Sequence, residues 1–337
     1  MKNEKNLSVV LPCYNVEDFI ADCLDSLLNQ DIPQSDYEII CVDDCGKDNT
    51  KQIIKEYQTR YDNITLVEHE INKSAPAARN TAISQCNGKY VWFVDPDDMI
   101  ERDCLKYLLA KCDEGELDIL LFNNKIVNEK GNFIQSEILV PYSHSVVSGQ
   151  EYLIEYFDGK LINVSVAWRG IYRTKLLSEN HIQFPIIRSG DDSIFIWRAM
   201  IKGNRVCSVD KTPYLYRVNQ NSLTSDKNKI KIPFLYAKGI SFPNEIVSVI
   251  NDYQIDIKNK INENLIQTIK FHNTDFVNKI LGLKSKYLKE IYSKLKGDTN
   301  TLKALYPYLN RKSQILYQKN RFFFIWYFKL KYLQVIK

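Results

Sequence analysis

Gly88-Lys-Tyr-Val-Trp-Phe-Val-Asp-Pro-Asp-Asp98 is the stretch of this chain that decides its fold. The apolar run Tyr90–Val94, between a glycine and a proline, predicts a buried strand. Asp95, Asp97 and Asp98 follow at the strand's C-terminal end, the edge at which open α/β sheets bind ligands. Such closely spaced carboxylates suit Mg²⁺ or Mn²⁺, which prefer oxygen ligands and complete their shells with substrate phosphates. The alternative is a plain acidic turn in which Asp97 or Asp98 caps the helix that follows.

Strands and helices alternate along the first part of the chain. Buried strands are predicted at 7–11, 37–42, 64–67 and 90–94, with helices between them at 16–29, 48–61 and 75–86. This order predicts an α/β fold with a mostly parallel, Rossmann-like sheet and right-handed crossovers. Further on, the pattern predicts a strand at 118–123, a hairpin within 126–140, a helix at 191–202 and short strands at 206–209 and 214–217. We place a domain boundary near residue 225, between a catalytic domain (1–225) and a helical C-terminal region (226–337).

Composition limits the class of protein. Hydrophobic residues make up 45% and charged residues 26% of the 337 positions, which is ordinary for a soluble globular chain, and a net charge of +4 gives no reason to expect a nucleic-acid partner. The eight cysteines form no Cys-x-x-Cys pair and there are only four histidines, so no zinc site is expected and the cysteines fit a reducing compartment. No signal peptide and no membrane-spanning run is predicted, so we expect a cytoplasmic protein.

Other polar groups join the acids after the central strand. Asp43 and Asp44 end the predicted strand 37–42, so both acidic turns lie along one rim of the sheet and can face one ligand. The first pair can accept the N3–H of uracil or a ribose hydroxyl, and the second can hold ribose and a metal on a diphosphate. Arg79, on a helix of small residues, can neutralise negative charge there. No glycine follows the first strand in Pro12–Asn15, which excludes a dinucleotide fingerprint and a Walker A loop.

Gly190-Asp191-Asp192 is a third acidic element, at the start of a predicted helix. Either acid can cap that helix. One of them can instead be a general base for a hydroxyl acceptor. The sequence leaves both readings open.

Five segments in order resemble the family 2 glycosyltransferases, which have the GT-A fold. They are Leu7-Ser-Val-Val-Leu-Pro-Cys-Tyr-Asn15, Ile40-Cys-Val-Asp-Asp-Cys-Gly46, Asn72-Lys-Ser-Ala-Pro-Ala-Ala-Arg-Asn80, the DxD motif Asp95-Pro-Asp97 and Gly190-Asp-Asp192. Ala167–Arg173 and Tyr216–Thr224 also resemble segments of bacterial polysaccharide and lipooligosaccharide members. The resemblance spans about residues 6 to 225.

The resemblance implies a role for each matching residue. Asp44, with Asp43 close by, contacts the nucleotide base, Pro12 and Tyr14 line its pocket, and Arg79 lies near the uracil and diphosphate. Asp95 and Asp97 bind ribose and Mn²⁺ or Mg²⁺, and Asp192 takes the acceptor's proton in an inverting transfer. Arg217 belongs to a loop that closes over the donor diphosphate or to a plain surface turn. Trp168 and Tyr216 stack on acceptor sugars or are core aromatics, and Asp191 contacts the acceptor.

Three departures from the family pattern have consequences. Ser74 replaces the usual glycine, which puts the turn of that loop in question, and Asp191 replaces the usual glutamate. The Gln-x-x-Arg-Trp element of processive synthases is absent, which favours transfer of a single sugar from a UDP-sugar to a glycan or lipid-linked acceptor. A sugar nucleotidyltransferase and a catalytically relic assembly protein of the same pathway are the alternatives.

The segment 311–337 is basic and aromatic. It contains Phe322-Phe-Phe-Ile-Trp-Tyr-Phe328, seven lysines or arginines and no acid. Aromatic residues beside cations suit the headgroups of an anionic leaflet. We therefore expect peripheral binding to the inner face of the cell membrane. The alternative is a helix docked on the catalytic domain or on a second subunit of a homodimer.

Overall fold

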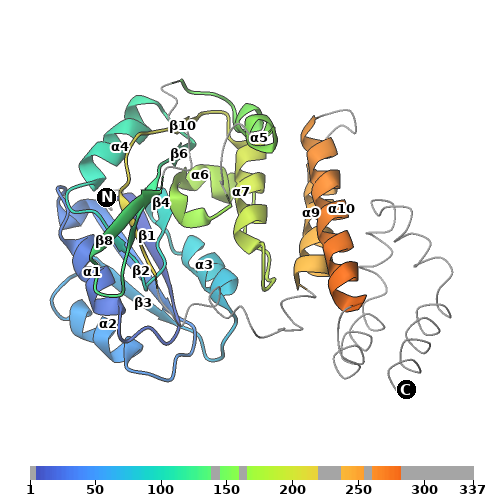
Figure 1. The fold of residues 1–337 in the computed structure, drawn as a ribbon. Helices are drawn as coiled ribbons and strands as arrows, with labels where there is room; N and C mark the ends of the chain where they lie inside the picture. Colours follow the sequence, from blue (N-terminus) through green and yellow to red (C-terminus); the bar gives the residue numbers. More distant parts are fainter. Residues whose placement is uncertain (1–4, 138–144, 159–164, 219–236, 254–259, 282–337) are drawn as a thin grey trace, which may run out of the picture. The chain divides into compact units, whose positions relative to one another are not determined.

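The computed structural model describes residues 5–137, 145–158, 165–218, 237–253 and 260–281 (Figure 1). The chain divides into two compact units. Unit 1 comprises Met1–Ile186 and Asp191–Lys227, and unit 2 comprises Ile187–Gly190 and Asn228–Lys337. The basic segment 311–337 and the residues that follow Val218 in the predicted donor loop lie outside the described residues.

Unit 1 is built on a seven-stranded sheet in the order β10-β6-β9-β4-β1-β2-β3. Its strands are β1 (Lys5–Cys13), β2 (Tyr37–Asp43), β3 (Ile64–Glu68), β4 (Gly88–Phe93), β6 (Ile119–Leu121), β9 (Gly170–Arg173) and β10 (Val206–Ser208). β1 pairs in parallel with β2 and β4, whereas β9 runs antiparallel between β4 and β6. The predicted α/β fold with a mostly parallel sheet is confirmed, but β9 is not among the predicted strands.

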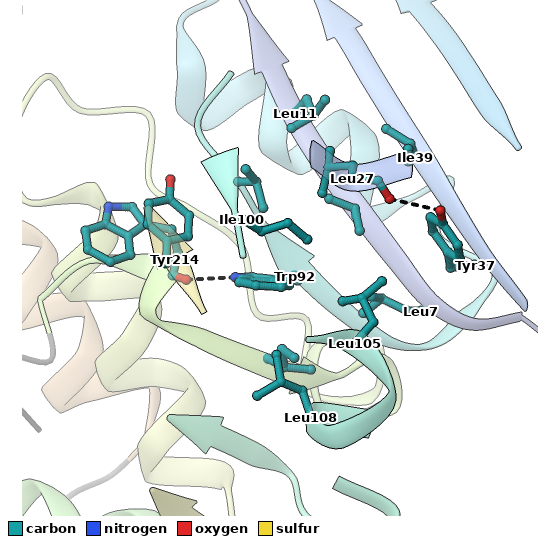
Figure 2. Close-up of a cluster of buried hydrophobic side chains, with 14 of the residues drawn as sticks. Leu7, Leu11, Leu27, Tyr37, Ile39, Trp92, Ile100, Leu105, Leu108 and Tyr214 are labelled. Atoms are coloured by element: carbon teal, nitrogen blue, oxygen red, sulfur yellow. Dashed lines mark hydrogen bonds between the residues drawn. The ribbon is translucent and has the colours of Figure 1, made fainter. Parts of the chain in front are cut away.

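Both faces of the central strands are buried, which explains their unbroken apolar runs. Trp92 of β4 joins alternate residues of β1 from Leu7 to Leu11 in one buried cluster, part of which is drawn in Figure 2. Phe93, the next residue along β4, points to the other face, because side chains alternate along a strand. There it packs against the rings of Phe184 and Phe195, with centroids 5.0 and 5.2 Å away.

Seven α-helices belong to the described part of unit 1. They are α1 (Ile20–Leu28), α2 (Thr50–Gln58), α3 (Ala75–Ile83), α4 (Leu105–Glu114), α5 (Gly149–Phe157), α6 (Thr174–Glu179) and α7 (Asp191–Lys202). α1, α2 and α4 supply residues to the cluster around Trp92. α3 packs against β1 and β2, on the side of the sheet opposite α1 and α2 (Figure 1).

The start of α4 excludes one interpretation of the acidic turn. Gln30 Oε1 accepts hydrogen bonds from the amides of Cys104 and Leu105, at 3.1 and 3.3 Å, and Asp31 binds the next amide. Asp97 and Asp98 therefore do not cap this helix.

A second, four-stranded sheet has the order β5-β11-β7-β8. Its strands are β5 (Met99–Ile100), β7 (Asn124–Val127), β8 (Phe133–Glu137) and β11 (Tyr214–Arg217). β7 and β8 are antiparallel, which confirms the hairpin predicted within 126–140. β5 pairs with β11, so that Ile100, just after the acidic turn, lies opposite Tyr214.

In unit 2, the described residues after Ala237 are mainly helical. A π-helical turn (Ala237–Ser241) leads into α9 (Phe242–Asp252), which packs against α10 (Lys260–Leu281). Across the described ranges of both units, we find no helix with the length and apolar character needed to cross a bilayer.

Candidate active site

Two acidic turns lie at one edge of the seven-stranded sheet. Asp43 is the last residue of β2, and Asp95 lies just beyond the end of β4. β1 lies between these strands and is parallel to both, with Cys13 in register with Asp43. Because parallel strands end at the same edge, both turns lie on the rim where α/β sheets bind ligands.

Arg79 of α3 is the centre of the site. Its guanidinium is 2.8 Å from Asp95, 3.3 Å from Asp192 and 3.5 Å from Asp191, and the residue is only 7% exposed. The ring of Phe184 lies against it, 5.2 Å from the guanidinium carbon. Burial lowers the pKa of Arg79, but the three carboxylates more than offset this and raise it overall. A permanent cation therefore joins Asp95, in the turn after β4, to the two acids of α7.

The two acids of α7 lie inside its first turn, where a helix stabilises negative charge. Gly190 precedes them with φ +85°, a conformation that favours glycine. A side chain at Gly190 would also meet the ring of Phe242, which lies 2.3 Å from the position of a Cβ atom. Gly190 thus gives the chain a sharp entry into α7, and both carboxylates of its first turn lie within 3.5 Å of Arg79.

Burial changes the proton affinity of these acids. It raises the pKa of Asp192 to about 7, against the opposing effect of Arg79 and with help from Asp191 and Asp95. Burial likewise raises the pKa of Asp191. An acid with a pKa near neutrality inside a polar site can accept a proton and release it again.

Unlike Asp95, which pairs with Arg79, Asp97 forms no ion pair with any residue in the described ranges. Its side chain is half-buried, and burial together with the nearby Asp95 raises its pKa to about 6. A cation placed beside Asp95 and Asp97 would reverse this shift, since opposite charge favours the ionised form. The described residues contain no group of three or more acidic, histidine or cysteine side chains arranged to hold a metal ion.

Asp44 is held by the loop that leads into α3. Its Oδ1 accepts a hydrogen bond from the amide of Lys73 (2.8 Å) and lies 2.7 Å from Nδ1 of His69. Its Oδ2 accepts from the amide of Ser74 (2.7 Å), and only 2% of the residue is exposed. Asp44 therefore fixes the loop from which the helix of Arg79 begins.

Ser74 stands in this loop with φ 83° and ψ 158°, a conformation that is essentially confined to glycine. Its hydroxyl oxygen is buried and lacks a hydrogen-bond partner within the described part of the chain. The loop thus keeps a glycine-type turn although the residue is serine. The amide of Ser74 still reaches Asp44, so the departure from the family pattern removes no contact to Asp44.

We expect Ser74→Gly to stabilise the protein by about 1 kcal/mol. Strain at such a residue costs about 1–3 kcal/mol, and the extra freedom of glycine in the unfolded chain offsets roughly 0.5–1 kcal/mol of the gain. Urea unfolding measures the change. Ser84→Gly is the matched control, because Ser84 ends the same helix with φ −70° and should lose stability. If Ser74→Gly is less stable than the wild type, the backbone at Ser74 is not strained.

The remaining residues predicted to contact the nucleotide lie at the same edge. Pro12 is buried within β1, and Tyr14, just after that strand, is 44% exposed. Asp43 is 2% exposed, and burial raises its pKa, although its Oδ1 accepts a bond from the amide of Gly46 at 3.3 Å. Tyr14 is therefore the side chain of this group that offers an open aromatic surface.

Arg217 does not belong to an open loop or a surface turn. Its guanidinium binds Asp22 at 3.0 and 3.1 Å and the carbonyl oxygen of Glu129 at 2.8 Å, and the residue is 3% exposed. Its Nε is buried without a hydrogen-bond partner in the described structure. Arg217 thus joins α1 to the small sheet, an arrangement that neither interpretation of the sequence anticipated.

The two aromatic residues predicted for the acceptor differ in burial. Trp168 is 6% exposed and stacks on Tyr214, with centroids 4.2 Å apart and planes 12° apart. Arg169 lies over the same ring, 4.7 Å from its centroid. Trp168 is therefore a core aromatic, as the second interpretation held. Tyr216 is only half-buried, with its ring 6.0 Å from that of Trp168.

Sequence reasoning missed three residues of the site. Phe184 supports Arg79, His69 holds Asp44, and Tyr214 binds the acidic turn itself, as described below. None of the three belongs to one of the acidic or glycine-containing motifs from which the site was predicted. Only Tyr214 gave a signal, since it opens a predicted strand two residues before the Tyr-Arg pair of the family segment.

The chain is similar to known glycosyltransferases in sequence and in structure. In sequence, the chain is 34% identical to the poly(ribitol-phosphate) beta-glucosyltransferase of Bacillus spizizenii over 64% of this chain and 32% of that protein. It thus spans about a third of the length of that relative. It is 30% identical to the putative teichuronic acid biosynthesis glycosyltransferase TuaG of Bacillus subtilis over 68% of this chain and 86% of TuaG.

Among solved structures, Staphylococcus aureus TarS 1-349 in complex with UDP-GlcNAc superposes with a TM-score of 0.63 and 26% identity. The match covers 90% of this chain and 80% of that one. The GT-A fold expected from the sequence is therefore confirmed. The model of the family described as "Glycosyl transferase family 2" matches residues 8–179. With that match and the extended similarity to TuaG, the chain belongs to glycosyl transferase family 2.

Proposed function

We propose that the protein transfers a single sugar, with inversion, from a UDP-sugar to a hydroxyl group of a cell-surface glycan or a lipid-linked acceptor. The observation that carries the proposal is the convergence of Asp95, Asp191 and Asp192 on the buried guanidinium of Arg79. It joins the turn that follows β4 to a carboxylate able to act as a base.

Asp192 is the proposed general base. Its pKa of about 7 lets it be ionised in a large part of the molecules at neutral pH and still bind a proton firmly. It would take the proton of the acceptor hydroxyl as the oxygen attacks the anomeric carbon and the bond to the nucleoside diphosphate breaks. Attack in line with the leaving group inverts that carbon.

The cation of Arg79 has a second use in this scheme. The leaving nucleoside diphosphate carries negative charge, and a guanidinium binds phosphate oxygens well. Because Arg79 already lies 2.8 Å from Asp95, it stands beside the turn where the diphosphate would bind. On the base side, Asp44, with Asp43 close by, is proposed to contact the nucleotide base. Pro12 and the exposed ring of Tyr14 are proposed to line its pocket.

Asp95 and Asp97 are the residues that would hold Mn²⁺ or Mg²⁺. Carboxylate oxygens are the ligands these ions prefer, and two carboxylates leave the rest of the shell to diphosphate and water. When bound, the ion would act as a Lewis acid that stabilises the leaving diphosphate. The raised pKa of Asp97, caused by burial and by the nearby Asp95, fits this assignment, because a bound cation would offset both effects.

We expect Asp97→Asn to weaken binding of UDP in the presence of Mn²⁺ by about tenfold or more, the usual effect of losing a charged contact. In EDTA the variant and the wild type should bind alike, because the contact acts through the cation. Calorimetric titration of UDP with both proteins, with Mn²⁺ and with EDTA, measures this. Equal affinity of the wild type in Mn²⁺ and EDTA would exclude a metal at this site.

The names of the relatives support the proposed acceptor class. One is a poly(ribitol-phosphate) transferase, another is assigned to teichuronic acid biosynthesis, and TarS was solved with UDP-GlcNAc. These activities belong to those proteins. For this chain they make UDP-GlcNAc and UDP-glucose the first donors to test, and a polyol-phosphate or uronic acid polymer the first acceptors.

We also propose that the protein acts at the cytoplasmic face of the membrane, where the segment 311–337 binds the lipid headgroups. The alternative is that this segment docks on a second subunit of a homodimer. Its cations and aromatic residues suit anionic lipid. Full-length protein should pellet with phosphatidylglycerol vesicles, and a chain ending at Asn310 should not. If both proteins pellet equally, the segment does not bind the membrane. If the full-length protein is a dimer and the truncated chain is a monomer, the segment serves the dimer instead.

A further inference from the structure

We infer that Tyr214 is a positioning residue for the acidic turn Asp95–Asp98, and through this turn for the nucleotide-sugar donor. The inference rests on the proposed function, since that function assigns the donor to the turn. Tyr214 belongs to β11, far along the chain from the turn, and none of its atoms need touch the donor.

The hydroxyl of Tyr214 makes two hydrogen bonds to the turn. It accepts from the amide of Asp95 at 3.1 Å and donates to Oδ2 of Asp98 at 2.6 Å. The other oxygen of Asp98 accepts from the amide of Arg217 at 2.7 Å. Both ends of the turn are therefore fixed to one strand, β11.

The turn also closes on itself, because the amide of Asp98 donates to the carbonyl oxygen of Asp95 at 3.0 Å. Asp98 is 1% exposed and its two oxygens are used within the chain. This carboxylate is thus a support for the turn and not a candidate ligand. Asp95 and Asp97 are left as the carboxylates of the turn that can face a donor or cation.

Tyr214 is itself firmly held, as a positioning residue must be. It is fully buried, and its ring stacks on Trp168 at 4.2 Å. The carbonyl oxygen of Trp168 accepts a hydrogen bond from Nε1 of Trp92 at 2.8 Å, drawn beside Tyr214 in Figure 2. Since Trp92 belongs to β4, which leads into the turn, the support runs from this strand through Trp168 and Tyr214 back to the turn.

The test is Tyr214→Phe, which removes the hydroxyl and keeps the ring that stacks on Trp168. Tyr37→Phe is the matched control. Tyr37 is fully buried, its hydroxyl donates one hydrogen bond to the carbonyl oxygen of Leu27 at 2.9 Å, and it lies on the opposite side of the cluster in Figure 2. Both variants lose a buried hydroxyl, but only one of them loses a contact to the turn.

Two measurements on the full chain separate positioning from stability. Hydrogen–deuterium exchange of the segment 94–100 should be faster in Tyr214→Phe and unchanged in Tyr37→Phe. Binding of UDP with Mn²⁺ should weaken about tenfold in Tyr214→Phe only, because about 1.4 kcal/mol of the binding free energy is then spent on ordering the turn. If Tyr214→Phe does not fold, Tyr214→Phe/Asp98→Asn, which leaves no unpaired buried carboxylate, should give the same two results.

Exchange and UDP affinity that are alike in the two tyrosine variants would overturn the inference, because Tyr214 would then contribute stability alone. Faster exchange in Tyr214→Phe with unchanged UDP affinity would overturn the link to the donor. A wild-type protein that binds no UDP-sugar would refute the proposed function instead, and the exchange result would still decide whether Tyr214 holds the turn.

Discussion

We expect the Asp192→Asn variant to transfer sugar about 10²–10⁴-fold more slowly than the wild type, the usual contribution of a general base. Asparagine keeps the size of the side chain and can still contact Arg79, but it cannot take up the acceptor's proton. Donor binding should therefore be retained. Release of UDP in the presence of acceptor measures the rate, and calorimetry measures binding.

Asp191→Asn is the matched control, since the two acids are adjacent and both lie within 3.5 Å of Arg79. If Asp191→Asn loses the activity and Asp192→Asn keeps it, the base is Asp191 and the assignment of Asp192 is wrong. In the wild type, kcat/KM should rise with pH up to about 7 and then level off, because the ionised form of Asp192 is the active one.

The same pKa predicts an effect on stability with an unusual sign. Because the folded state raises the pKa of Asp192 from 3.8 to about 7, the folded protein binds the extra proton between these values. The contribution of Asp192 to the free energy of unfolding therefore falls as pH rises through this window. We expect Asp192→Asn to be more stable relative to the wild type at pH 8 than at pH 5, which thermal unfolding at the two values measures.

Arg79→Gln should have the largest effect on stability. It leaves Asp95, Asp191 and Asp192 in a partly buried site without their shared cation, and removal of one partner from a buried ion pair costs about 3–5 kcal/mol. The loss should be greater at pH 8 than at pH 5, because protonation relieves the repulsion among the acids. Urea unfolding at both values tests this.

Lys51→Gln is the control for removing a charge. Lys51 pairs with Glu68 at the exposed surface, so its replacement should change stability little at either pH. If Arg79→Gln loses as little stability as Lys51→Gln, the three carboxylates do not need the charge of Arg79 to be stable in the folded protein. Arg79→Lys should recover only part of the lost stability, because an ammonium cannot contact three acids with the fixed fork of a guanidinium.

The fold could be predicted where a local pattern decides the structure. β1, β2, β3 and β4 are apolar runs between turns, and alternation with helices requires parallel pairing. β9 escaped prediction because it has only four residues, Gly170–Arg173, and its place between β4 and β6 depends on partners distant in the sequence. α1 begins at Ile20, four residues after the predicted start, and the amides of Val16 and Glu17 bind the side chains of Thr50 and Asp48.

The sequence predicts which charged residues belong to the site, but it does not predict which of them contact one another. Asp95, Arg79 and Asp192 stand in recognisable motifs, but their shared contact joins three elements separated by up to 113 residues. The sequence predicts a donor loop at Arg217, because Tyr216–Thr224 resembles a segment of the family. Its partner Asp22 lies 195 residues away, and no local pattern could identify it.

The most direct test of the account is release of UDP from UDP-GlcNAc, UDP-glucose, UDP-galactose and UDP-GalNAc by the wild type with Mn²⁺ and acceptor polymer. We predict that one donor is consumed well above the others, that EDTA stops its consumption, and that Asp192→Asn binds this donor without turning it over. Failure of the wild type to bind or consume any of the four would contradict the assignment of this site to sugar transfer from UDP.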